Sequence, residues 1–154
     1  MDDRGLEGLP LQLLLTVVVL GLTLPVVFGI WTTSDRSSTL DRVRSSAETL
    51  ALQIDRIYRS GYGNAQSMTV DFSSGSFTKV DRIEIGGPLN STRSQTIRWT
   101  LSDGQRGELV IPSPAKARCN PCPGQVLVLS AGRTTIFLEA NRTGAQLYVS
   151  LLVR

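Results

Sequence analysis

Two closely spaced cysteines are the residues whose type and spacing could support covalent chemistry. Cys119 and Cys122 are separated by two residues and lie in a stretch rich in proline. A single cysteine pair cannot complete a four-ligand zinc site within the chain. A thioredoxin-type redox pair is expected at the start of a helix that follows a strand, which a proline-rich loop between strands does not match. We therefore predict a small structural disulfide that closes a loop. Free thiols, a redox pair and an intermolecular disulfide or metal site are the alternatives.

Two asparagines are candidates for covalent modification. Asn90 and Asn141 each begin a triplet that matches the glycosylation acceptor N-x-[ST]. Both fall in segments that we predict to be turns, which suits an exposed acceptor, although so short a motif often arises by chance. A disulfide and glycans would both place this part of the chain outside the cytoplasm.

The composition argues against an enzyme and against nucleic-acid binding. The chain has no histidine, the commonest general base and metal ligand. The serine-rich segment 73–76 is better explained as a turn than as a nucleophile site. Sixteen basic residues, all but Lys79 and Lys116 arginine, give a net charge of only +3 and are spread along the chain, whereas nucleic-acid binding requires clustering. We expect no catalytic residue, no metal and no cofactor.

The element that must position the rest is an apolar segment near the N-terminus. Residues 8–34 carry no charged side chain, and a helix over residues 9–31 would be roughly 34 Å long, enough to cross a bilayer of ~30 Å. The segment is apolar all round, and Pro25 is a place where it could bend. We predict a retained membrane helix; a cleaved secretory signal and a buried helix of a soluble protein are the alternatives. Representative positions of the apolar surface are Leu13, Val17 and Leu20.

A second helical pattern follows over residues 32–60. Its apolar residues recur at spacings of three and four, which predicts an amphipathic helix. No proline or glycine lies between Trp31 and Arg59, so the two helices could form one rod. We expect the stripe to pack on the chain's own sheet, with helix–helix contact as the alternative. The stripe consists of Leu40, Val43, Ala47, Leu50, Ile54 and Ile57.

The remaining residues, 61–154, alternate between apolar and polar in short runs. Turn signals at regular spacing separate these runs, which is typical of an antiparallel β-sandwich or open barrel. The sequence therefore predicts an α+β fold with one long helix and a β-rich head. The predicted strands are 68–72, 77–85, 95–101, 106–112, 125–130, 133–139 and 146–153, with a turn at 141–144.

The charges around the apolar segment conflict with the expected orientation of the head. One basic residue, Arg4, precedes the segment, whereas Arg36, Arg42 and Arg44 follow it. The positive-inside rule alone would place the head in the cytoplasm. The cysteine pair and the sequons favour the opposite side.

The start of the chain supplies a motif that bears on this conflict. Arg4 and Gly5 are followed by Leu6, and Glu7 and Gly8 are again followed by a leucine. With the apolar helix behind it, this opening resembles that of archaeal type IV pilin-like proteins with a class III, prepilin-type signal peptide. The resemblance implies cleavage after Gly5, or alternatively after Gly8, by a prepilin peptidase on the cytoplasmic side, with the head outside the cell.

The resemblance also implies an organisation and a function. Residues 1–5 (alternatively 1–8) would be the leader, 6–31 the transmembrane or filament-core helix, 32–60 the amphipathic helix and 61–154 the extracellular head. The expected function is a major or minor subunit of a type IV pilus-like filament. Its partners would be copies of itself or related pilins, the peptidase and assembly machinery, and membrane lipid before assembly. The alternative is a single-pass anchored extracellular β-domain that binds an envelope partner or acts like an archaellum stator.

One position departs from the bacterial pattern. Many bacterial pilins carry a glutamate at the fifth mature position, where this chain has Pro10 after a cut at Gly5 and Leu13 after a cut at Gly8. The departure favours an archaeal type of filament.

Overall fold

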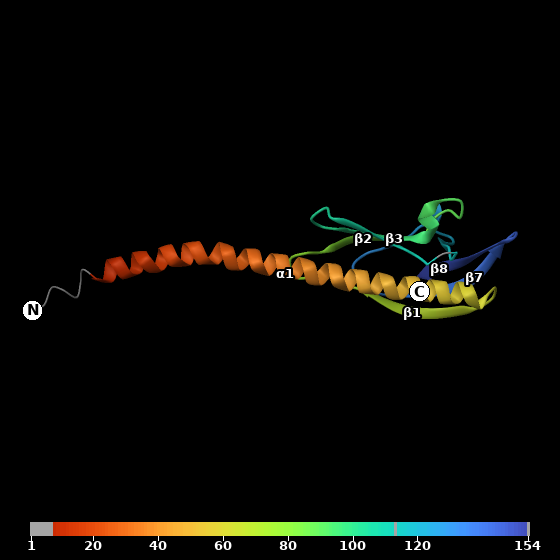
Figure 1. Cartoon of the computed structure of the whole chain (residues 1–154), viewed down its shortest axis with the longest axis horizontal. Helices are drawn as coiled ribbons and strands as arrows, with labels where there is room; N and C mark the ends of the chain where they lie inside the picture. The colour runs from red at the N-terminus through yellow and green to blue at the C-terminus, as the bar shows by residue number, and fades with distance from the viewer. Residues whose placement is uncertain (1–7, 113, 154) are drawn as a thin grey trace, which may run out of the picture.

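The computed structural model describes residues 8–112 and 114–153. A single long helix, α1 (Gly8–Ser60), leads into a head built of eight strands. Figure 1 shows the first half of α1 projecting from the head and the second half running alongside the strands. The predicted processing site, Arg4, Gly5 and Leu6, lies outside the described residues.

The head consists of two four-stranded sheets, with strand orders β1-β7-β8-β5 and β4-β3-β2-β6. Neighbouring strands are antiparallel except for β5 and β8, which pair in parallel. The predicted α+β class with a β-rich head is confirmed, and neither sheet closes into a barrel over the described part of the chain. The strands are β1 (Ala65–Phe72), β2 (Val80–Ile85), β3 (Thr96–Leu101), β4 (Arg106–Val110), β5 (Ala117–Cys119), β6 (Leu127–Leu129), β7 (Gly132–Thr143) and β8 (Gln146–Val153).

The turn between β7 and β8 is shorter than the sequence suggested. We expected a turn at 141–144, but β7 continues to Thr143, with Asn141 opposite Tyr148 in the ladder. The chain reverses at Gly144, whose φ of 61° is left-handed and costs glycine little. Asn141 is therefore a strand residue.

The second half of α1 forms part of the core of the head. It contacts β1, β7 and β8 of one sheet and β4 of the other. The apolar stripe is the face that these contacts bury: Val43, Ala47, Leu50 and Ile54 are fully buried and Ile57 nearly so, while Leu40 is partly buried. The stripe and the inward side chains of both sheets form one hydrophobic cluster, so the head includes the helix rather than merely being attached to it.

The first half of α1 has the opposite character. Every side chain from residue 11 to residue 31 is exposed. The helix continues through Pro25, and 21 residues at ~1.5 Å each give about 31 Å. Among the described residues, α1 is the one helix that is long and apolar enough to cross a membrane. The chain is therefore compatible with single-pass anchoring in a membrane.

Candidate functional site

The exposed apolar half of α1 is a long unpartnered surface in the part of the chain that the structure describes. Leu13, Val17 and Leu20 are 67%, 59% and 51% exposed. Apolar side chains on every face of a helix require an apolar environment on every side, which lipid tails or other helices provide. This surface can bind apolar partners, and it carries no reactive group.

A shallow groove marks one face of this surface. Gly21, Pro25 and Gly29 follow one another at four-residue spacing and line it together with Leu24 and Phe28. A Cβ atom added at either glycine would meet nothing within 4 Å. The backbone is therefore accessible here, and a second helix could approach it closely.

The threonine hydroxyls within the apolar half form hydrogen bonds within the helix itself. The hydroxyl of Thr16 donates to the carbonyl of Gln12 at 2.8 Å, and that of Thr23 donates to the carbonyl of Val19 at 2.9 Å. Because these bonds stay within the helix, the hydroxyls need no water. The segment is suited to an apolar medium despite its threonines.

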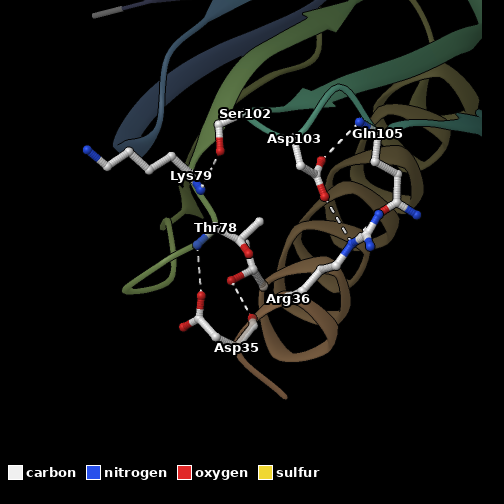
Figure 2. A network of polar contacts seen from close by, with 8 residues as sticks. Asp35, Arg36, Thr78, Lys79, Ser102, Asp103 and Gln105 are labelled. Carbon is white, nitrogen blue, oxygen red and sulfur yellow. Dashed lines mark hydrogen bonds and ion pairs between the residues drawn. The ribbon is translucent and has the colours of Figure 1, made fainter. Parts of the chain in front are cut away.

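The junction between the two halves of α1 is built around Asp35. Its carboxylate accepts hydrogen bonds from the backbone N–H groups of Ser76, Phe77 and Thr78 at 2.8, 3.0 and 2.8 Å. Figure 2 shows Asp35 of the helix below the head loop that carries Thr78. These bonds stabilise the ionised form and hold the pKa of Asp35 below its ordinary value. The loop between β1 and β2 is thereby fixed to the helix.

The next residue of the helix holds a second loop. Arg36 Nε lies 3.0 Å from an Asp103 carboxylate oxygen and donates to Gln105 Oε1, also at 3.0 Å. Asp103 and Gln105 belong to the hairpin turn between β3 and β4, and the Gln105 N–H donates back to Asp103. Two consecutive helix residues thus bind two different loops of the head (Figure 2).

The approach of the first loop to the helix depends on a glycine. A Cβ atom at Gly75 would lie 2.6 Å from Asp35 Oδ1 and closer still to the Thr39 hydroxyl. Any larger residue at this position would displace the loop or these side chains. The serine-rich segment that we interpreted as a turn is therefore the part of the head that fits against the helix.

An aromatic pair extends the junction into the apolar half of α1. The rings of Phe28 and Phe77 meet edge to face, with centroids 5.5 Å apart, a favoured aromatic geometry. Phe28 lies within the charge-free segment 8–34, whereas Phe77 belongs to the head. The head therefore contacts the apolar half as well as the amphipathic half.

The sequence profile of DUF7311, a domain of unknown function, matches residues 11–151. The chain belongs to the DUF7311 family. No curated protein and no solved structure matches it. The match begins in the apolar half of α1 and ends in β8, so the DUF7311 unit contains the helix, the junction and the head together.

The cysteine pair of this DUF7311 chain is a structural element of the head. Cys119 and Cys122 form a disulfide with Cα atoms 5.3 Å apart. Cys119 ends β5, is 1% exposed and pairs with Leu151 of β8 in the ladder. The bond closes a short loop at the sheet edge, as a structural disulfide does.

The two sequons lie in different settings. Asn90 is exposed in a turn between β2 and β3, and its amide is open to a modifying enzyme. Asn141 is half-buried in β7, where its amide donates to Glu139 at 3.2 Å. Only Asn90 has the surroundings that we expected for both.

The outer face of the β4-β3-β2-β6 sheet carries paired charges. Glu84 lies between Arg82 and Arg98, with an N···O distance of 2.9 Å to each. Opposite charges side by side on a sheet stabilise pairing. Within the part of the chain that the structure describes, no group of three or more His, Cys, Asp or Glu side chains could hold a metal.

The junction was missed when only the sequence was considered. Asp35 and Arg36 are the first charged residues after the apolar segment, which was a usable signal that they mark its end. Their partners lie 41 to 69 residues further along the chain, and nothing in the local pattern connects them.

Proposed function

We propose that this DUF7311 chain is a structural subunit, major or minor, of an archaeal type IV pilus-like surface filament. One observation carries the proposal: a single unbroken helix has one half exposed on every side, while one face of its other half is buried in a β-rich head. The apolar half of such a helix must be covered by lipid or by other protein helices. The folded head limits how closely the helices of neighbouring copies can pack.

The proposed mechanism has two stages. Lipid covers the apolar half while the subunit is in the membrane, and copies of the same helix cover it after extraction. Packing of many such helices buries their apolar side chains against one another and leaves the heads outside. The groove at Gly21, Pro25 and Gly29 supports the second stage because it lets neighbouring helices approach closely.

Processing would precede assembly. We propose cleavage after Gly5, or alternatively after Gly8, by a prepilin peptidase at the cytoplasmic face, with the head on the outer side. The disulfide between Cys119 and Cys122 supports that orientation, because such bonds persist in oxidising compartments.

A second candidate is a single-pass anchored extracellular domain that stays in the bilayer and binds an envelope partner. The observation that favours it is the contact between Phe77 of the head and Phe28 of the apolar half. This contact brings the head down onto the segment that lipid would surround, which suits a protein that remains in the membrane.

The experiment that separates the two candidates is intact-mass measurement of the protein from native membranes and from sheared extracellular material. Loss of residues 1–5 or 1–8, with most of the protein in the sheared fraction, is the result expected of a filament subunit. A full-length mass confined to membranes would refute the filament and leave the anchored domain.

A pair of variants tests the processing site. Gly5→Val should block maturation if the first site is used, and Gly8→Val is the matched control at the second site. Because each single variant keeps the other site, normal maturation of the double variant Gly5→Val/Gly8→Val is the result that would rule out prepilin-type processing at these glycines.

A further inference from the structure

The loop formed by residues 73–79, here called the interface loop, contains a large apolar side chain that the head leaves uncovered. Phe77 is 49% exposed on an otherwise polar loop between β1 and β2. The neighbour recorded for its ring is Phe28, at 5.5 Å between centroids. The loop therefore has an apolar tip that points towards the apolar half of α1 rather than into the core.

We propose that the interface loop binds the lipid surface, with Phe77 seated in the interfacial zone of the bilayer beside Phe28. The inference concerns the membrane-resident chain and holds whether or not that chain later enters a filament.

The position of Phe28 sets the depth of Phe77. Phe28 precedes Trp31 by three residues, about 4.5 Å along the helix. Tryptophan is typical of the boundary between hydrocarbon and headgroups, and the charge-free segment ends only three residues after Trp31. A ring packed on Phe28 lies at this boundary or just inside it, where an aromatic side chain is more stable than in water.

The backbone N–H groups at the tip of the interface loop are hydrogen-bonded, which permits the tip to lie within the interfacial zone of the bilayer. Three consecutive backbone N–H groups, from Ser76 to Thr78, donate to the Asp35 carboxylate. Free N–H groups would resist transfer towards hydrocarbon. Asp35 lies four residues, about 6 Å, beyond Trp31, so the charge that holds the loop stays at headgroup level.

The charges near the tip fit a lipid headgroup layer. Lys79 is exposed, and Figure 2 shows its side chain extending away from the polar network. A lysine two residues from an aromatic tip seated in the interfacial zone can reach the phosphate level of the headgroups. Asp103, the acid of the neighbouring hairpin turn, is paired with Arg36. At this end of the head, Phe77 and the ammonium group of Lys79 can both contact lipid, and the charge of Asp103 does not oppose the contact because Arg36 neutralises it.

This contact would fix the orientation of the head on the membrane. The junction at Asp35 and Arg36 holds the head to the helix, and Phe77 adds a contact with the bilayer itself. A chain that left the membrane would have to expose Phe77 to water or cover it with another apolar surface.

The test uses the full-length protein in phosphatidylcholine vesicles. Phe77→Cys is labelled with an environment-sensitive fluorophore (NBD), and its quenching by a lipid with a shallow nitroxide is measured. The two native cysteines are joined as a disulfide and do not compete for the label. Tyr62→Cys is the matched control, because Tyr62 is 70% exposed and lies two residues after the end of α1 in the head.

We expect the label at position 77 to emit at shorter wavelength than the label at 62 and to be quenched at least twofold more strongly. Equal emission and equal quenching at the two positions would overturn the proposal. Because Phe77→Cys removes the aromatic ring, Lys79→Cys provides a second reporter with the ring intact. That label should also be quenched more than the control, and quenching no greater than at position 62 would count against the proposal equally.

The result is independent of filament formation. A chain that is never found in sheared material can still show shallow quenching at position 77, and a processed filament subunit can fail to show it. The two proposals therefore fail separately.

Discussion

Replacing Leu50 by alanine tests whether the second half of α1 is an integral part of the head. Leu50 is fully buried within the cluster that joins the helix to both sheets. The substitution removes three carbon atoms, and at about 0.8 kcal/mol per buried methylene their transfer is worth about 2.4 kcal/mol. The cavity left behind adds to this, so we expect the free energy of unfolding to fall by about 3 kcal/mol, within the range of about 2–5 kcal/mol measured for such changes.

The assay is unfolding of the full-length protein in detergent micelles, in a chain whose Trp31 is replaced by phenylalanine, followed by the fluorescence of Trp99, which is buried in the head. For a head of this size, ~3 kcal/mol corresponds to a midpoint lower by roughly 10 °C or more. Leu52→Ala is the matched control: the same substitution in the same helix two residues away, at a side chain that is 63% exposed. We expect it to change stability by less than about 0.5 kcal/mol.

Helix propensity cannot account for a loss at Leu50, because alanine is the stronger helix former. If the two variants unfold at the same midpoint, the sheets must fold without support from the helix, and the reasoning above is wrong. A large loss at Leu52 with none at Leu50 would mean that the buried face of α1 is incorrectly assigned.

Three further predictions concern the junction, the disulfide and the sequons. The pKa of Asp35 in the folded protein lies below its ordinary 3.8, so its stabilising effect is complete above pH 3.8 and is lost as the pH falls through the lower folded pKa. Unfolding midpoints measured from pH 2 to 7 should therefore fall less at acid pH for Asp35→Asn than for the native chain. Parallel curves for the two proteins would refute this. Replacing Cys119 and Cys122 together by alanine opens a four-residue loop and should cost about 2 kcal/mol in the same unfolding assay, with no change at all as the contrary result. Glycopeptide mass spectrometry of the native protein should find any glycan at the exposed Asn90 and none at the half-buried Asn141, and any modification at Asn141 would contradict the structural argument.

The long helix and its buried stripe could be derived from local sequence alone. The apolar residues from Leu40 to Ile57 recur at helical spacing, and a stretch without proline or glycine connects them to the apolar segment. Both signals depend on residues three or four positions apart, which a helix brings together whatever the rest of the chain does.

The strands were predictable where alternation of apolar and polar residues is bounded by turn signals. Ile97, Trp99 and Leu101 of β3 point inward as the pattern required. Strand β5 has three residues and pairs in parallel with β8, and it was missed because the prolines around it made this stretch look like a loop. The end of β7 was misplaced because the sequon at Asn141 looks like a turn, while the reversal needs only the left-handed Gly144.

The junction could not be predicted because it is made by tertiary contacts. Asp35 appears in the sequence as an ordinary acid at a membrane boundary, and its three donors are backbone groups that any residue would supply. Only the folded head, which brings the loop between β1 and β2 next to the helix, gives the carboxylate its role.

The order of Pro25 and the junction residues along α1 determines which part of the helix can change direction. Pro25 lacks an N–H group and so cannot donate to the carbonyl of Gly21, which makes it the place where the helix bends most easily. It precedes Phe28, Asp35 and Arg36, the residues through which the junction attaches the head. A bend at Pro25 would therefore reorient the apolar segment that precedes it and leave the junction intact. The apolar segment can then change its tilt relative to the head without breaking the contacts that hold the head on the helix.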